Sequence, residues 1–258
     1  MRVISLSCDG VFQAAGRGLF QWLAGQDAEI ICLQDLRAPS HEVEDRPEFQ
    51  LEDYFTYTFQ AADPDCNGIA IYTRQAPKAI MYGFGLQSGE DMDGRYLQAD
   101  FEELSIVSLI TPDAEGGPEQ AEAKDRFIMG LQAHMEKITR KRRRYIFCGN
   151  WQMVATLDDV ENGGEQEGEP SSLLAGRQWF RQLYSDIGYA DAFRTSNSDM
   201  DEFSWWPSGT IGEGGGWRTD TQIISGSLKP NVEYAVLYKA RGFSSHAPVI
   251  VDYDMGEL

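Results

Sequence analysis

Short apolar runs recur along the chain and predict buried β-strands. Residues 2–8, 29–34 and 68–73 are short and mostly apolar, as in strands that are covered on both faces. Residues 54–59 alternate aromatic and polar side chains, which predicts a strand with one buried face. The same reasoning predicts strands at residues 95–101 and 104–110, paired as a hairpin, and at residues 145–148, 203–206, 217–224, 232–237 and 248–252.

Apolar residues at helical spacing predict helices between the strands. From Phe127 to Ile138 they recur at spacings of four, four and three, which places them on one face of a helix. Shorter apolar faces predict a helix around residues 19–23 and another over residues 173–187. Residues 158–170, rich in Glu and Gly, are expected to form an acidic loop. Because no repeat, linker or break in composition divides the chain, we predict a single α/β domain over residues 1–258.

Composition indicates a globular protein and limits its partners. The 258 residues are 42% hydrophobic, enough for a large core, which excludes disordered, collagen-like and coiled-coil classes. They include 41 acidic and 22 basic residues, which gives a net charge of −19. Such a charge repels phosphates, so we expect weak or no nucleic-acid binding by the protein alone. No apolar stretch approaches the roughly 20 residues of a membrane span, and no membrane association is expected.

The cysteines and the first residues of the chain indicate a reducing compartment. Cys8, Cys32, Cys66 and Cys148 lie far apart without a Cys-x-x-Cys pair, and the chain has only three histidines. This pattern favours free, mostly buried thiols over disulfides or a metal site. Residues 1–8 lack the apolar core and cleavage site of a signal peptide, so we expect a cytoplasmic protein.

Four short segments carry polar residues at the ends of predicted strands. They are Ile-Ser-Leu-Ser-Cys-Asp-Gly at residues 4–10, Ile-Cys-Leu-Gln-Asp at 31–35, Phe-Cys-Gly-Asn-Trp-Gln at 147–152 and Ser-Ser-His-Ala-Pro at 244–248. In this order they resemble the motifs of the endonuclease/exonuclease/phosphatase superfamily, which includes exonuclease III. The resemblance implies a four-layer α/β/β/α sandwich of two mixed sheets, with the functional site at the strand ends on one rim.

The resemblance also assigns roles to the motif positions. In the superfamily, carboxylates hold Mg²⁺ and orient the attacking water, while Asn, Tyr and His side chains act at the phosphate. Here Asn150 stands at the position of the water-orienting Asp, and Ser245 at that of a metal-binding Asp. An amide is a negligible base, and a lost general base costs about 10²–10⁴ in rate. The positions of this degenerate site are Ser7, Asp9, Asp35, Ile110, Asn150, Gln152, Asp220, Ser245 and His246.

Only three of these positions, Asp9, Asp220 and His246, match the superfamily in residue type. Asp35 is one methylene shorter than the usual metal-binding Glu, and Ile110 offers no donor where relatives have Tyr. We therefore expect no catalytic activity, no bound metal and no cofactor, as in a pseudoenzyme. In such a site the pair of Asp220 and His246 is expected to serve as a structural hydrogen bond.

An active rim is the alternative that this pattern leaves open. Asp9 and Asp35 would then hold a weakly bound Mg²⁺. With Asp220 and His246 in a shifted geometry, the chain would be a Mg²⁺-dependent phosphodiesterase or nuclease of the exonuclease III type.

Four longer strings are more specific than the superfamily motifs. They are Arg-Tyr-Leu-Gln-Ala-Asp at residues 95–100, the basic run before Tyr-Ile-Phe-Cys-Gly at 141–149, Phe-Ser-Trp-Trp-Pro at 203–207, and His-Ala-Pro-Val-Ile-Val-Asp-Tyr-Asp at 246–254. They closely resemble the bacterial catabolite repression control (Crc) family. The resemblance implies a translational repressor of catabolic genes that has no nuclease activity and acts with the RNA chaperone Hfq on A-rich mRNA.

Six basic residues gather in the eight positions that precede the predicted strand at 145–148. Cations near a helix C-terminus complement the helix dipole, each by at most about 1 kcal/mol, but one or two would suffice for that. We expect the cluster to contact RNA phosphates or an acidic partner surface. A scaffold protein that binds some other partner through the same cluster is a further alternative. The six residues are Lys137, Arg140, Lys141, Arg142, Arg143 and Arg144.

Overall fold

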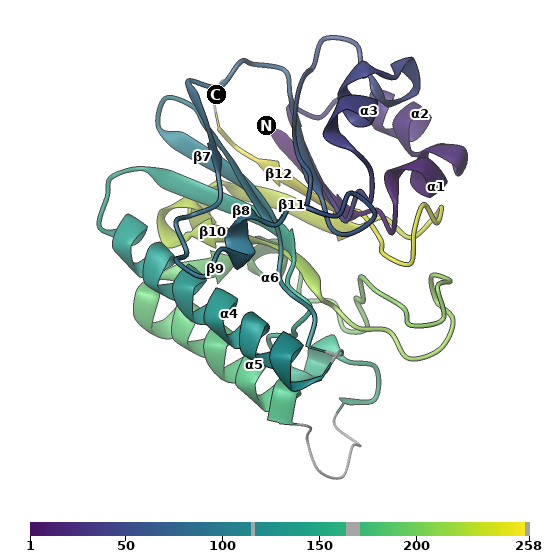
Figure 1. The fold of residues 1–258 in the computed structure, drawn as a ribbon. Coiled ribbons are helices and arrows are strands. Elements are labelled where there is room, and N and C mark those ends of the chain that lie inside the picture. The colour runs from purple at the N-terminus through teal and green to yellow at the C-terminus, as the bar shows by residue number, and fades with distance from the viewer. Residues whose placement is uncertain (115–116, 164–170, 256–258) are drawn as a thin grey trace.

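Two six-stranded β-sheets pack face to face and carry helices on their outer faces (Figure 1). The computed structural model describes residues 1–114, 117–163 and 171–255. Within these residues the first sheet has the strand order β11-β12-β1-β2-β4-β3, and the second has the order β5-β6-β7-β8-β10-β9. Neighbouring strands are antiparallel except for the pairs β1–β2 and β7–β8, which are parallel, so both sheets are mixed.

The elements have the following bounds. The strands of the first sheet are β1 (Arg2–Ser7), β2 (Ile30–Gln34), β3 (Phe55–Phe59), β4 (Ile69–Thr73), β11 (Val232–Leu237) and β12 (Val249–Tyr253). Those of the second are β5 (Ala79–Tyr82), β6 (Tyr96–Asp100), β7 (Leu104–Ile110), β8 (Arg144–Asn150), β9 (Tyr189–Asp191) and β10 (Asp220–Ser225). The α-helices are α1 (Val11–Gly16), α2 (Leu19–Ala24), α3 (Ser40–Asp45), α4 (Pro118–Thr139), α5 (Ser171–Gln182) and α6 (Ala192–Ser196), and a π-helical turn (Leu183–Ile187) follows α5.

The inner strands are apolar throughout because both of their faces are covered. In β2, Ile30 and Cys32 point into the core between the sheets, while Ile31 and Leu33 belong to the cluster under α1, α2 and α3. A strand in this position has no solvent-facing side, which explains its continuous apolar sequence. The strand predicted at residues 29–34 is confirmed.

The helix predicted from Phe127 to Ile138 is confirmed and forms part of α4. Phe127, Leu131, Met135 and Ile138 are buried against the outer face of the second sheet, together with side chains of α5. Figure 1 shows α4 and α5 side by side on this face, while α1, α2 and α3 lie on the opposite side of the molecule. The predicted four-layer α/β/β/α sandwich is thus confirmed.

The two strands predicted around Trp205 and Trp217 are wrong in extent. These residues form an isolated β-bridge with each other, and β10 begins only at Asp220. The physical reason for the late start of β10 is that the residues before it use their backbone donors elsewhere. The N–H of Arg218 donates to the Asp159 carbonyl at 2.7 Å, and that of Thr219 donates to the Ser204 hydroxyl at 3.0 Å, so neither needs a strand partner.

The two shortest strands have no signal in the sequence, whereas the state of the thiols does. The four-residue strand β5 and the three-residue strand β9 were not predicted, since elements of this length carry no measurable period. All four cysteines are free, and Cys66 alone among them is exposed, as the sequence led us to expect. No helix in the described part of the chain is long and apolar enough to cross a membrane.

The first strand of the chain pairs with the last. In the β1–β12 ladder Arg2 lies opposite Asp252, and their side chains form an ion pair with an Nε–Oδ1 distance of 2.7 Å. The N-terminal ammonium group donates a hydrogen bond to the carbonyl of Tyr253 at 2.9 Å. Met1 therefore lies beside the last residue of β12.

Candidate functional site

The ends of several strands bring the motif residues together on one rim of the sandwich. Asp9 and Asp35 directly follow the parallel strands β1 and β2. Asn150 ends β8 and lies opposite Asp220, the first residue of the antiparallel strand β10. The loop before β12 adds His246, which bonds to Asp220. Residues far apart in sequence thus form one polar site.

Two matching turns hold the carboxylates of Asp9 and Asp35 at this rim. Both residues have positive φ, 51° and 54°, a conformation that costs about 1–3 kcal/mol in a residue other than Gly. The Cys8 N–H donates to the Gln34 carbonyl at 2.8 Å, and the Gly10 N–H donates to the Asp35 carbonyl at 2.9 Å. These bonds join the turns to each other, so the two carboxylates have fixed positions.

Asp220 and His246 form a buried hydrogen-bonded pair. The distance from His246 Nδ1 to Asp220 Oδ2 is 2.8 Å, and the Ser204 hydroxyl donates to the same oxygen at 2.7 Å. Burial lowers the pKa of His246, but the carboxylates of Asp220 and Asp9 outweigh burial, and the pKa is raised overall. Asp220 Oδ1 is buried without a hydrogen-bond partner among the described residues. The centre of the His246 ring lies 6.2 Å from that of the Trp205 ring.

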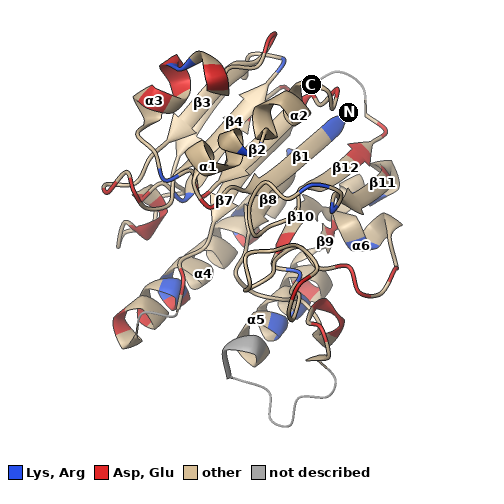
Figure 2. Ribbon diagram, turned by 90° about the vertical axis from the view of Figure 1, so that its right-hand side faces the viewer, with Lys and Arg blue, Asp and Glu red and all other residues tan. Residues whose placement is uncertain are grey.

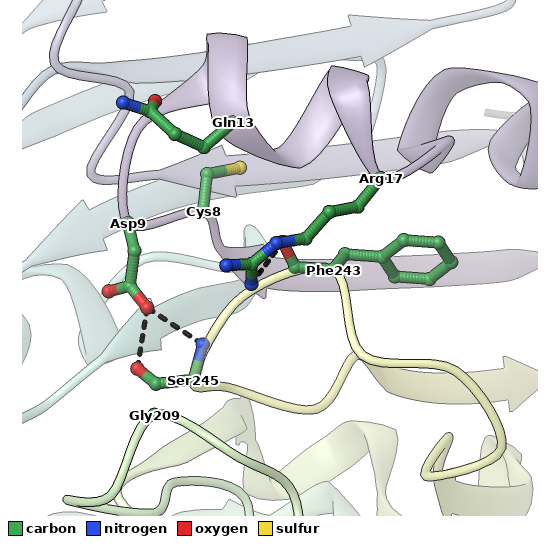
Figure 3. A pocket seen from close by; sticks show the side chains of 7 residues that line it. All are labelled: Cys8, Asp9, Gln13, Arg17, Gly209, Phe243 and Ser245. Carbon is green, nitrogen blue, oxygen red and sulfur yellow. Dashed lines mark hydrogen bonds between the residues drawn. The ribbon is translucent and has the colours of Figure 1, made fainter.

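Asp9 is engaged by Ser245, the residue at the position of a metal-binding Asp. The backbone N–H and the hydroxyl of Ser245 both donate to Asp9 Oδ2, at 2.7 and 2.5 Å (Figure 3). Asp9 Oδ1 lies 3.9 Å from His246 Nε2. Ser245 therefore acts as a donor to the neighbouring carboxylate, whereas an Asp at this position would add a second negative charge.

Asp35 is held by Arg37, a residue that sequence reasoning did not single out. Arg37 Nε lies 3.0 Å from Asp35 Oδ1, and Arg37 Nη2 lies 2.6 Å from Asp35 Oδ2, so the contact is bidentate. Burial raises the pKa of Asp35, and the guanidinium of Arg37 opposes that rise. The sequence signal that could have indicated this contact is the basic residue two positions after Asp35.

Asn150 makes only structural contacts at the centre of the rim. Its amide nitrogen donates to the Ser7 hydroxyl at 3.4 Å, and its oxygen accepts the backbone N–H of Gln152 at 3.1 Å. The Gln152 side-chain oxygen is buried without a hydrogen-bond partner within the described residues. Ile110 is 3% exposed and packs in the core between the sheets. None of these side chains is a base.

A small pocket of about 140 Å³ opens beside the rim (Figure 3). The guanidinium of Arg17 reaches over it and donates to the Phe243 carbonyl at 3.4 Å. Asp9 and Ser245, two residues of the rim, are among the residues that line it and lie side by side in Figure 3. Its lining residues are Cys8, Asp9, Gln13, Arg17, Gly209, Phe243 and Ser245.

The rim as a whole does not fit a divalent metal ion. Within the described ranges, no group of three or more His, Cys, Asp or Glu side chains is placed to hold one. Both oxygens of Asp35 accept N–H groups of Arg37, and Asp9 Oδ2 accepts two donors from Ser245. Mg²⁺ requires near-octahedral oxygen coordination, and three of the four carboxylate oxygens of Asp9 and Asp35 already accept hydrogen bonds.

The six basic residues before β8 do not form one uniform surface. Arg143 is half-buried and donates to the carbonyls of Phe101 and Leu104 at 2.9 and 3.1 Å, which fixes the hairpin of β6 and β7. Arg144 pairs with Glu103 at 3.4 Å. On the side of the molecule seen in Figure 2, acidic residues are spread over several helices and loops. Four residues of the cluster are exposed and make no ion pair among the described residues: Lys137, Arg140, Lys141 and Arg142.

Comparison with known proteins gives relatives along nearly the whole chain. The chain is 27% identical over 253 residues to the exodeoxyribonuclease of Bacillus subtilis (strain 168), and the match covers 96% of this chain and 98% of that protein. It is 26% identical over 272 residues to exodeoxyribonuclease III of Haemophilus influenzae, covering 98% and 100% of the two chains. No protein-family model matches the chain.

Solved structures agree with these relatives in fold. The catalytic domain of Xenopus laevis APE2 superposes with a TM-score of 0.84 at 23% identity, covering 98% of this chain and 92% of that one. An AP endonuclease from Archaeoglobus fulgidus gives a TM-score of 0.83 at 16% identity, covering 99% and 100%. With the sheet order described above, the chain shares the fold of these structures and is similar along nearly its whole length to proteins of the exonuclease III/AP endonuclease (endonuclease/exonuclease/phosphatase) superfamily.

Proposed function

We propose that the chain is a catalytically inactive member of this superfamily that represses translation in the cytoplasm, bound with the RNA chaperone Hfq to A-rich mRNA. The observation that carries the proposal is the pair of neutral side chains, Asn150 and Ser245, at rim positions where hydrolysis needs carboxylates. The longer strings shared with the catabolite repression control family select this partner and this RNA.

The chemistry of the rim supports the loss of catalysis. Asn150 has its oxygen and nitrogen engaged by Gln152 and Ser7, so it neither accepts a proton nor orients a water as a carboxylate would. A missing general base costs about 10²–10⁴ in rate, and a missing donor at the phosphate about 10²–10³. The second of these losses applies here because Ile110 has no donor to offer at the phosphate. The two together leave little rate enhancement, even though such losses are not additive.

The charge distribution supports binding to RNA through a partner. A net charge of −19 repels phosphates, while the exposed residues Lys137, Arg140, Lys141 and Arg142 offer local positive charge. Such a cluster adds affinity once another protein presents the RNA at short range, because salt screens the repulsion beyond about 10 Å. The chain alone then binds RNA weakly and joins a preformed complex of Hfq with RNA.

Gel-shift measurements with an A-rich RNA test the proposal. We expect no shift with the purified protein alone and a further retardation of the Hfq–RNA band when the protein is added. Tight RNA binding without Hfq, or no effect on the Hfq–RNA band, would contradict the proposal. A reporter mRNA with an A-rich leader, translated in vitro with both proteins, checks that assembly lowers protein synthesis.

A triple variant locates the interaction. We expect Arg140→Gln, Lys141→Gln and Arg142→Gln together to weaken assembly and reduce its salt dependence, since fewer counterions are released on binding. The matched control removes the same charge elsewhere, through Arg46→Gln, Arg74→Gln and Lys229→Gln, all exposed residues. Equal losses in the two triple variants would show that the effect is one of net charge, not of this cluster.

An active Mg²⁺-dependent phosphodiesterase or nuclease is the second candidate function. The observation in its favour is that Asp9, Asp220 and His246 keep the residue types of the superfamily, and that the last two form a 2.8 Å contact. The names of the bacterial relatives, both exodeoxyribonucleases, agree with it. Incubation of the protein with single-stranded or abasic DNA and Mg²⁺ or Mn²⁺ decides the matter. Turnover that disappears in His246→Ala would establish this function in place of the first.

A further inference from the structure

A permanent cation lies at the carboxylate where the superfamily holds its metal ion. Arg37 donates two hydrogen bonds to Asp35, of 3.0 and 2.6 Å, one to each carboxylate oxygen. From this geometry we infer that Arg37 is a built-in replacement for the divalent cation, an inference that rests on the proposed non-catalytic function. The rim is thus a site in which the metal has been exchanged for a side chain.

The turn that carries Arg37 fixes its position. Asp35 and Arg37 both have positive φ, 54° and 48°, on either side of the buried Leu36. The N–H groups of Leu36 and Arg37 donate to the carbonyls of Gly68 and Asn67 at 3.0 and 2.8 Å. On the other side, the carbonyl groups of Asp35 and Leu36 accept bonds from residues 10 and 11. A backbone held from both sides directs the guanidinium to the carboxylate.

Guanidinium and metal ion exclude each other at this carboxylate. Arg is not deprotonated in proteins, so its charge cannot be lost to make room for a metal. Its planar fork matches the two carboxylate oxygens, whereas Mg²⁺ has to bind those oxygens directly at about 2.0–2.1 Å. At Asp9, Oδ2 accepts two donors from Ser245, and Oδ1 lies 3.9 Å from His246 Nε2, so this carboxylate also faces hydrogen-bond donors. The side chain of Asp35 is therefore neutralised within the chain itself.

This exchange has a consequence for attempts to restore the rim. Replacing Asn150 and Ser245 with Asp returns the carboxylates of the superfamily but leaves Arg37 on Asp35. We therefore expect the double variant Asn150→Asp/Ser245→Asp to bind metal poorly, and the triple variant with Arg37→Gln to bind it well. Arg37→Gln is then expected to raise the affinity for the metal ion by a larger factor in the Asn150→Asp/Ser245→Asp variant than in the unchanged protein.

Binding of Mn²⁺, followed by the loss of its free electron paramagnetic resonance signal, tests the inference on the full chain. We expect no saturable binding by the unchanged protein at millimolar Mn²⁺, and at least a tenfold gain in affinity for Arg37→Gln. Arg46→Gln is the matched control, because its arginine is also ion-paired and equally exposed, at 46% against 48%. The control is expected to behave as the unchanged protein does.

Several outcomes would overturn the inference. These are submillimolar Mn²⁺ binding by the unchanged protein, or equal affinities of Arg37→Gln and Arg46→Gln. Should Arg37→Gln fail to fold, Arg37→Lys keeps the charge but not the fork, and we expect it to gain Mn²⁺ affinity by a smaller factor; no gain would count against the inference. Failure here leaves the gel-shift result with Hfq unchanged, so it is distinguishable from failure of the proposed function.

Discussion

Removal of Arg218 should destabilise the fold more than any exposed ion pair does. This arginine is 4% exposed and bonds to Asp159 Oδ1 and Asp191 Oδ2, each at 2.7 Å. Asp159 belongs to a short turn at residues 157–159, and Asp191 caps the N-terminus of α6. Arg218 thus joins two separate segments to the residues that lead into β10 and the rim.

The magnitude of the loss follows from what remains buried in Arg218→Met. Breaking a buried ion pair by removing one partner costs about 3–5 kcal/mol, because the other charge stays buried without compensation. Asp159 keeps a contact to Arg194 at 3.2 Å, and Asp191 keeps the Thr221 hydroxyl at 2.8 Å. These partners limit the cost, so we expect about 3 kcal/mol, a large share of the 5–15 kcal/mol typical of folded proteins.

Urea unfolding followed by tryptophan fluorescence measures the effect. The matched control is Arg126→Met, which breaks a pair with Glu90 in which the arginine side chain is 48% exposed, and we expect it to cost less than about 1 kcal/mol. Adding Asp159→Asn and Asp191→Asn to Arg218→Met should recover part of the loss, because no charge is then left buried. A loss below about 1 kcal/mol for Arg218→Met, or no recovery in the triple variant, would refute the reasoning.

Three further changes have defined outcomes. Burial, together with the charges of Lys137 and Lys141, lowers the pKa of His134 from 6.5 to about 4. Between these pH values His134 is protonated in the unfolded chain but not in the folded one, so the folded state loses stability as the pH falls from 6.5 to about 4. The loss is at most about 3 kcal/mol, and urea midpoints at pH 7 and pH 5 should differ less in His134→Gln than in the unchanged protein. In Gly149→Ala the added Cβ would lie 2.7 Å from the Leu109 carbonyl oxygen, and we expect calorimetry to show a cost of about 1–3 kcal/mol; an unchanged Tm would contradict this. Asp91 Oδ2 accepts the backbone N–H groups of residues 84, 85 and 86, so Asp91→Ala should cost about 3 kcal/mol or more in urea unfolding, and a cost below about 1 kcal/mol would show that water replaces the carboxylate.

The sequence predicted those parts of the fold whose burial leaves a periodic trace. Helix α4 shows a single buried face, and β2 is covered on both sides, so each pattern has one simple interpretation. The residues around Trp217 have the residue types of a strand, but the N–H groups of Arg218 and Thr219 donate to the Asp159 carbonyl and the Ser204 hydroxyl. Such competition between a side chain and a strand partner depends on tertiary contacts and leaves no local signal.

The sequence predicted most members of the candidate site and the contact of Asp220 with His246, but neither Arg37 nor the contact of Asp9 with Ser245. The motifs placed Asp9, Asp35 and Asp220 at strand ends, and the structure brings them to one rim. The contact of Arg37 with Asp35 depends on two positive φ values in residues other than Gly, which sequence patterns do not indicate. The basic cluster illustrates the same limit, since Arg143 and Arg144 contact the hairpin of β6 and β7, whereas Lys141 and Arg142 are exposed.

The pairing of the first strand with the last also affects how the chain is made. On the ribosome β1 emerges early, yet β12, which supplies its second neighbour, begins at Val249. At about 5–20 residues per second, an interval of roughly 10–50 seconds separates the synthesis of these two strands. During that time one side of β1 has free backbone donors and acceptors in the middle of an unfinished sheet, so the nascent chain is most exposed to aggregation before β12 has been added.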